Sequence, residues 1–204
     1  MKIILSVIFL TSIILLGFQY SFKYAAASDS IVSAGGNGSS WDSFTPSSVT
    51  IKTGEKIVWS NPMFVSEPHT VTFMKNQSDF APPAAPYSIS NLTKLNPMLP
   101  DQNMEPFVVS DNNGTKFVIV DNARQFKPVA IDSSGNNVTY LDNNAKYNMI
   151  GDEKFVNSGW IWPKGLSPPG VLPINNFTVT FEKPGTYNYI CSIHPWMNGV
   201  ITVE

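Results

Sequence analysis

Short runs that alternate apolar and polar residues, separated by turn residues, dominate this chain, and no convincing amphipathic helix interrupts them. Successive side chains of a strand point to opposite faces. Large apolar residues alternate along 177–181, and after the turn at 183–185 two tyrosines and Cys191 alternate along 187–191. The pattern predicts an all-β chain, folded as a sandwich or a barrel. The sulfur of Cys191 should point inward beside the aromatic rings.

The N-terminal segment has the order of a secretory signal peptide. Lys2 is followed by an uncharged apolar run over 3–18, and a small-residue cleavage site lies at 25–27. We therefore expect residues 1–27 to be a signal peptide, or alternatively an uncleaved membrane anchor, and 28–204 to be a single folded domain. Either way, the folded part should be extracytoplasmic: secreted, periplasmic or anchored on the outer face of a membrane.

Charge excludes one class of partner. The formal net charge is −2, and no basic stripe suggests binding to nucleic acid.

Turn residues between apolar runs predict three hairpins. Their turns lie at 53–55, 112–114 and 133–135, and an Asn-Gly pair between apolar runs is a strong hairpin cue. The flanking runs are 48–51 with 56–60, 107–110 with 116–120, and 126–131 with 138–141.

The middle of the chain, from about 75 to 154, differs in composition. It is rich in Asn, Asp and Pro, and it contains no His and no Cys. Proline lacks the N–H that a sheet ladder needs, so the proline-rich stretch over 82–100 is predicted to be loop. We expect the segment 75–154 to be an elaboration with β structure that supplies no metal ligand and can be replaced by a short turn.

One cysteine and two histidines fall where a mononuclear copper site would need them. Cys191, His194 and Met197 share the run Cys-Ser-Ile-His-Pro-Trp-Met, and His69 lies in Glu-Pro-His-Thr. Two imidazoles, one thiolate and one weak thioether are the donors of a blue-copper electron-transfer site. A lone Cys in an exported chain has no partner for an internal disulfide, which leaves a spare thiol, an intermolecular bridge or a metal ligand.

These residues resemble a cupredoxin of the plastocyanin and amicyanin kind. The matching stretches are 44–46, 49–51, 53–55, 57–61, 68–71, 184–187 and 191–197. The resemblance implies a Greek-key β-sandwich of two sheets, with a long insertion between the first His ligand and the C-terminal ligand loop. It also implies one type 1 copper per chain, held by His69, Cys191, His194 and Met197.

The resemblance further implies supporting contacts and a docking surface. The backbone N–H of Thr70 should donate to the Cys191 sulfur, and Asn61 should brace the ligand loops. Redox protein partners are expected to dock near His194, which an apolar ring should surround. That ring comprises Pro68, Ile193, Pro195 and Trp196.

Other readings of the donor set remain open. A catalytic multicopper site needs additional His ligands that the chain does not have, so an electron carrier is favoured over an enzyme. A structural zinc site usually has four donors and would need a carboxylate such as Glu67. A copper carrier or storage protein without an electron-transfer role is compatible with the same donors. Trp196 could also pack into the core, or under the inserted segment, instead of forming a surface patch.

Overall fold

The structure, a computed structural model, describes the chain with gaps. The described residues are 29–36, 42–79, 84–88, 107–110, 112–114, 116–121, 123–142, 145–169, 171 and 173–204, with only the backbone of 84–88, 107–110 and 116–121 described. The predicted signal peptide or anchor at 1–27 lies outside them. Among the described residues no helix is long and apolar enough to cross a bilayer.

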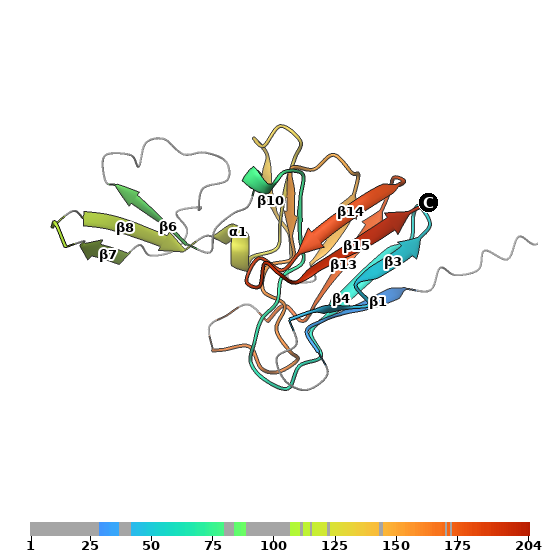
Figure 1. Cartoon of the computed structure of the whole chain (residues 1–204), viewed down its shortest axis with the longest axis horizontal. Helices are drawn as coiled ribbons and strands as arrows, with labels where there is room; N and C mark the ends of the chain where they lie inside the picture. The colour runs from blue at the N-terminus through green and yellow to red at the C-terminus, as the bar shows by residue number, and fades with distance from the viewer. Residues whose placement is uncertain are drawn as a thin grey trace, which may run out of the picture.

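Two β-sheets pack face to face and form the body of the molecule (Figure 1). The five-stranded sheet has the order β11 (Lys146–Met149), β13 (Asn176–Phe181), β4 (Lys56–Ser60), β1 (Ser30–Ala34) and β2 (Phe44–Thr45). The seven-stranded sheet has the order β10 (Val138–Tyr140), β9 (Val129–Ile131), β12 (Phe155–Asn157), β5 (Thr72–Met74), β14 (Gly185–Ile190), β15 (Asn198–Val203) and β3 (Ser48–Ile51). The all-β sandwich predicted from the alternating pattern is therefore confirmed.

The core lies between the two sheets and follows the alternation of the sequence. In β13 the residues Phe177, Val179 and Phe181 are all fully buried. Trp59 of β4 is the largest fully buried side chain, and its ring centroid lies 5.3 Å from that of Tyr189 in an edge-to-face arrangement. Aromatic pairs of this geometry contribute about 0.5–1.5 kcal/mol beyond the burial of their area. The packing fixes the inner face of β14, which leads directly to Cys191.

The turn at 53–55 is not a hairpin, and this prediction was wrong. β3 before it belongs to the seven-stranded sheet and β4 after it to the five-stranded sheet. The backbone N–H of Thr53 donates to the carbonyl of Glu204, and that of Gly54 donates to the carbonyl of Phe181. Because these donors bond to the ends of strands in both sheets, the turn forms a corner of the sandwich.

The other two predicted hairpins are confirmed. β7 (Phe107–Ser110) pairs antiparallel with β8 (Lys116–Asp121), and β9 pairs antiparallel with β10. β6 (Ala84–Ser88) adds a third strand to the β7–β8 hairpin, on the other side of β8. This three-stranded sheet lies to one side of the sandwich, beyond the short helix α1 (Ala123–Phe126) (Figure 1).

Strand β6 also corrects the expectation that 82–100 is loop throughout. It contains Pro86, whose register partner in β8 is Ile119. β6 is an edge strand of its sheet. An edge strand can hold a proline because one side of its backbone needs no partner in the ladder.

The segment predicted as an insertion contributes to the main sheets as well as to the separate one. β9 and β10 extend the seven-stranded sheet, and β11 pairs in parallel with β13 at the edge of the five-stranded sheet. Val129, Ile131 and Phe155 form a second, smaller buried cluster there. A 3₁₀ turn, η1 (Gln77–Asp79), follows β5.

Candidate metal centre

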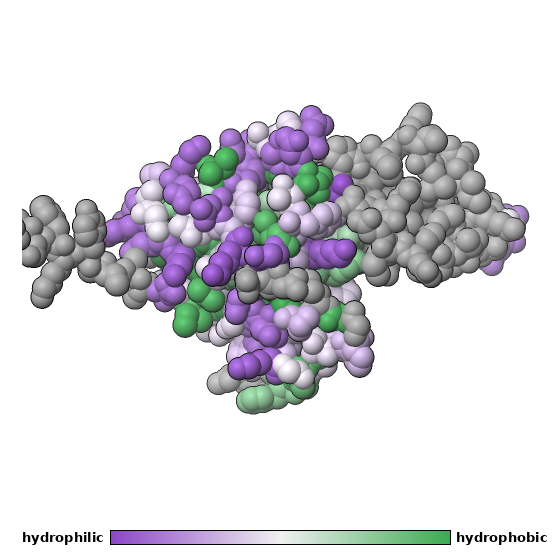
Figure 2. Space-filling view, turned by 180° about the vertical axis from the view of Figure 1, so that it is seen from behind, coloured by the Kyte–Doolittle hydropathy of each residue, from purple (hydrophilic) through white to green (hydrophobic). Residues whose placement is uncertain are grey.

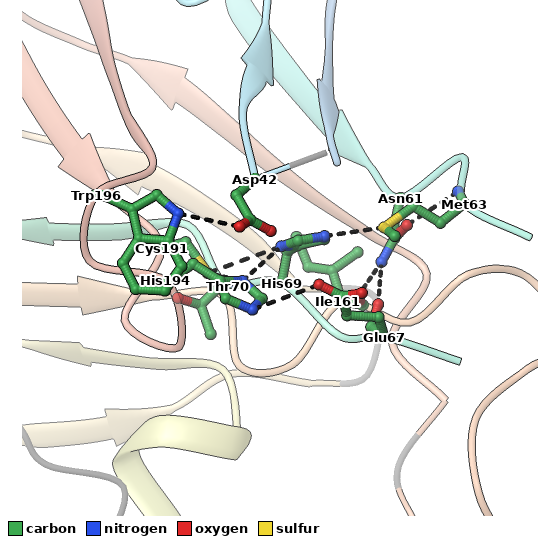
Figure 3. Close-up of polar contacts among 10 residues, drawn as sticks. All are labelled: Asp42, Asn61, Met63, Glu67, His69, Thr70, Ile161, Cys191, His194 and Trp196. Carbon is green, nitrogen blue, oxygen red and sulfur yellow. Dashed lines mark hydrogen bonds and ion pairs between the residues drawn. The ribbon is translucent and has the colours of Figure 1, made fainter. Parts of the chain in front are cut away.

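Three of the four predicted donors, His69, Cys191 and His194, lie close together (Figure 3). His69 lies just before β5, where its backbone forms a two-way bridge with Ile161, at 3.1 Å from His69 N to Ile161 O and 2.7 Å in return. Cys191 directly follows β14, and its side chain is fully buried as the strand alternation predicts. His194 lies three residues further on.

The loop that carries Cys191, His194 and Met197 is closed by its own backbone. The N–H of Cys191 donates to the carbonyl of Met197 at 2.9 Å, and the N–H of Met197 donates to the carbonyl of His194 at 2.8 Å. β14 and β15 pair up to Ile190 and Asn198 on either side of the loop. The loop is therefore a short connection whose ends are held by the sheet.

Three of the four predicted site residues present their donor atoms to one another. The Cys191 Sγ lies 3.9 Å from Nδ1 of His69 and 3.7 Å from Nδ1 of His194, and the two Nδ1 atoms are 3.2 Å apart. Met197 is buried at the end of the same loop. Its role as an axial ligand stays a prediction.

The three donor atoms fit a metal ion. A triangle with these sides has a centre about 2.1 Å from each corner, within the roughly 2.0–2.3 Å at which nitrogen and thiolate sulfur bind a divalent ion such as zinc. Two imidazoles and one thiolate are also the trigonal donor set of blue-copper sites. In both the chemistry and the spacing of its donor atoms, the triangle of His69, Cys191 and His194 suits such an ion.

Burial sets the protonation of the donors. Burial and the neighbouring His194 lower the pKa of His69 to about 4, against a smaller opposing effect of the Asp42 carboxylate. His69 is therefore neutral at neutral pH, as a metal ligand must be. Burial raises the pKa of the Cys191 thiol, and the N–H of Thr70 partly opposes this. Because the thiolate is the form that binds, metal binding should release the thiol proton.

The supporting contacts expected from the resemblance are largely present. The N–H of Thr70 donates to Cys191 Sγ at 3.3 Å, which confirms that prediction. Asn61 braces the loop that leads to His69. Its Nδ2 donates to the carbonyls of Glu67 and Ile161, and its Oδ1 accepts from the N–H of Met63.

The outer nitrogen of each imidazole has a neighbour that sequence patterns did not reveal. Met63 Sδ lies 3.0 Å from Nε2 of His69, and Glu67 Oε1 lies 3.4 Å from Nε2 of His194. A proton held on Nε2 leaves the Nδ1 lone pair free for a metal, so these neighbours favour the tautomer that binds. Because Glu67 faces the outer nitrogen of His194, its position gives no support to a zinc site that uses it as fourth donor.

Glycine is required beside His69. Gly35 has φ +92°, and a Cβ built on it would lie 2.7 Å from Nε2 of His69 and 2.6 Å from Met63 Sδ. Any side chain there would displace the imidazole or its sulfur neighbour. No local sequence pattern indicated this close approach.

The outer face of the centre is exposed at Trp196. This side chain is 64% exposed, and its ring centroid lies 5.5 Å from that of His194. The alternative in which Trp196 packs into the core is therefore wrong. Pro195 is exposed and Pro68 and Ile193 are half-buried.

A carboxylate also borders this face. Trp196 Nε1 donates to Asp42 Oδ2 at 3.1 Å, a contact that the sequence did not suggest. Asp42, Glu67 and His194 form a second group of donor atoms at the surface.

Comparison with known proteins shows that the chain is similar to two curated cupredoxins. Amicyanin-alpha of Methylorubrum extorquens is 42% identical over 41 residues, covering 20% of this chain and 34% of the relative. The chloroplastic plastocyanin of Physcomitrium patens is 34% identical over 90 residues, covering 41% of this chain and 53% of the relative. The chain resembles the cupredoxins of the plastocyanin and amicyanin kind.

The match to these cupredoxins is partial. The chain spans between a third and about half of the length of the curated relatives it matches. No family model matches the chain. Among solved structures, the oxidised plastocyanin of Dryopteris crassirhizoma is similar at a TM-score of 0.37 and 15% identity, covering 86% of this chain and 100% of that one.

Proposed function

We propose that this chain is an extracytoplasmic blue-copper electron-transfer protein. It shuttles single electrons between redox partners through one type 1 copper, held by His69, Cys191, His194 and Met197. The observation that carries the proposal is the convergence of Cys191 Sγ with the two Nδ1 atoms in a buried triangle. A trigonal site with a thiolate suits electron transfer better than the release of a metal cargo.

The protein supplies a rigid and nearly dry site. His69 and Cys191 are fully buried, and the side chain of His194 is 16% exposed. Bound copper supplies a one-electron couple between Cu(II) and Cu(I). Since the three donors are held by the bridge of His69 to Ile161, by β14 and by the closed ligand loop, they would change position little between the two states. His194 gives the site its edge toward solvent, where an electron can enter or leave.

The test is reconstitution with Cu(II). The purified protein without residues 1–27 should bind one equivalent of Cu(II) and become intensely coloured through thiolate-to-copper charge transfer. Visible absorption and electron paramagnetic resonance spectra report both the colour and the trigonal geometry. Colourless binding would favour a copper carrier, and no binding would contradict a copper site altogether.

We propose further that redox partners dock over His194, against Pro68, Ile193, Pro195 and Trp196. Figure 2 shows hydrophilic and hydrophobic residues interspersed over one face of the molecule. Large exposed hydrophobic side chains among the described residues are Ile31, Phe64, Val65, Ile150, Leu166 and Trp196. Trp196 is the one in this set whose ring lies against His194. Its apolar surface excludes water and allows a partner to approach the imidazole edge.

Replacing Trp196 with lysine should slow electron transfer to a small redox protein, because the charge disrupts close apolar contact. The visible spectrum and the reduction potential should stay nearly unchanged. The matched control is Ile150→Lys, which puts the same charge on another exposed hydrophobic residue. Ile150 precedes Gly151, which lies beside Tyr187, toward the end of β14 that is opposite Cys191. Stopped-flow kinetics should show a lower bimolecular rate constant for Trp196→Lys alone. Equal bimolecular rate constants in the two variants would mean that the electron does not enter near Trp196.

A further inference from the structure

A closed ring of buried polar groups joins the inserted segment to the two ligand strands. Its members are Thr70, Thr72, Gln125, Asn157 and Ser192, each at most 3% exposed. Thr70 directly follows His69, and Ser192 directly follows Cys191. Gln125 belongs to α1, within the segment that carries no predicted metal ligand.

The first half of the ring ties the ligand segments to each other. The N–H of Ser192 donates to Thr70 Oγ1 at 2.7 Å, and the two hydroxyl oxygens are 2.9 Å apart. Thr70 Oγ1 also lies 3.0 Å from Thr72 Oγ1. The backbone N–H of the same Thr70 donates to Cys191 Sγ. The position of Thr70 therefore determines the length of the hydrogen bond to the predicted copper thiolate.

The second half of the ring ties these residues to α1. Ser192 Oγ–H donates to Gln125 Oε1 in a short hydrogen bond, and Thr72 Oγ1–H donates to Asn157 Oδ1 at 2.9 Å. Asn157 Nδ2 then donates to the backbone carbonyls of Arg124 at 2.7 Å and Gln125 at 2.9 Å. α1 is thus anchored by its backbone to β12 and reaches the ligand loop through one side chain.

Gln125 also fixes the direction of the hydroxyl protons. A serine or threonine hydroxyl has one proton to donate. The protons of Ser192 and Thr72 go to the amide oxygens of Gln125 and Asn157, so both hydroxyls are left to accept near Thr70. Without the Gln125 oxygen, the Ser192 hydroxyl loses its acceptor and is free to turn toward Thr70.

We infer that Gln125 is a positioning residue for the copper thiolate, acting through Ser192 and Thr70. The inference rests on the proposed copper function for its redox consequence, but not for its structural part. Hydrogen bonding around the cysteine sulfur tunes the potential of such sites. A tight N–H···S bond withdraws charge from the thiolate and favours Cu(I), so a loosened one favours Cu(II).

Stability alone does not explain Gln125. Within the described part of the chain, its Nε2 is buried without a hydrogen-bond partner. A buried amide donor without a partner destabilises the folded state, because it has given up its hydrogen bonds to water. Leucine at this position has a similar size and removes both that cost and the contact to Ser192. Gln125→Leu should therefore separate loss of positioning from loss of stability.

The first measurement uses the copper-free protein. In Gln125→Leu, amide hydrogen exchange at Thr70 and Ser192 should be about fivefold faster, as expected for loss of one hydrogen bond of ordinary net strength. The amides of Ile57 and Val179 in the other sheet serve as internal controls and should be unchanged. Gln125→Glu keeps an acceptor oxygen and should restore slow exchange. Unchanged exchange at Thr70 and Ser192 in Gln125→Leu would overturn the inference.

The second measurement uses the copper-loaded protein. In a fixed redox buffer, the Cu(II) to Cu(I) ratio of Gln125→Leu should rise by about fivefold, the factor expected for one hydrogen bond of ordinary net strength. Ser192→Ala, which removes the same contact from its other side, should give the same shift, and the double variant should add little. The inference would be overturned if the changes in the Cu(II) to Cu(I) ratio of the two single variants added up in the double variant, or if neither variant changed the ratio. If Gln125→Leu does not fold, Ser192→Ala takes its place in both measurements.

The two measurements distinguish this inference from the proposed function. A wild-type protein that binds no copper contradicts the function, while the exchange result still decides whether Gln125 positions the ligand loop.

Discussion

Replacing Cys191 with serine should abolish the intense visible band of the copper-loaded protein. The band arises from charge transfer out of the thiolate, and a hydroxyl at this position has no comparable donor orbital. Serine is slightly smaller, and its oxygen can still accept the N–H of Thr70, so the buried position should remain filled. The measurements are the visible and electron paramagnetic resonance spectra after addition of Cu(II), with circular dichroism to verify folding.

The matched control replaces a different buried sulfur. Met149 of β11 is also buried, and it lies on the edge strand of the five-stranded sheet. Met149→Leu should keep the full intensity of the band. A band that survived in Cys191→Ser would mean that the colour arises from another ligand, and the proposed donor set would be incorrect.

The local part of the site could be predicted because it depends on short-range rules. Strand alternation gave the inward direction of Cys191, and the spacing to His194 and Met197 needs only a tight loop. The hydrogen bond from the N–H of Thr70 to Cys191 Sγ is implied by the resemblance to plastocyanin and amicyanin. Each of these residues is a predicted ligand or lies next to one in the sequence, or its contact is implied by the resemblance.

The remainder could not be predicted because it depends on contacts between distant segments. Gln125 meets Ser192 across 67 positions, and Trp196 meets Asp42 across 154. No periodicity encodes such pairs. The turn at 53–55 shows the same limit, since its residues specify a chain reversal but not which sheet each flanking strand joins. Sheet membership is decided by packing of the core.

Excising two nested parts of the inserted segment should have opposite effects. Replacing residues 85–120 by Asn-Gly should preserve both the fold and the copper spectrum. Ala84 and Asp121 are register partners in neighbouring antiparallel strands, so their Cα atoms are about 4.5–5.5 Å apart and a two-residue turn can join them. The excision removes most of the separate three-stranded sheet and keeps Gln125, β9 and β10.

Replacing all of 75–154 by a short turn should instead prevent stable folding, which reverses the expectation, drawn from the sequence, that this segment can be replaced by a short turn. That excision removes β9, β10 and β11, exposes the buried Phe155, and leaves β12 without its partner β9. Loss of a large aromatic side chain from a core costs about 3–5 kcal/mol, and domains of this kind have only about 5–15 kcal/mol of stability. Urea denaturation followed by circular dichroism measures the free energy of unfolding of both variants against the full chain.

The comparison also separates two roles of the inserted segment. If β9–β12 are integral to the sandwich, the short excision keeps the cooperative unfolding transition and the long one loses it. A long-excision variant that folded and gave the native copper spectrum would show that these strands only decorate the sandwich, and that the ring through Gln125 is dispensable. A short-excision variant that failed to fold would show that the three-stranded sheet supports the body of the molecule. The pairing of β9 with β12 and of β11 with β13 leads us to expect the first result. The first pairing extends the sheet that contains the ligand strands β5 and β14, and the second extends the sheet packed against it.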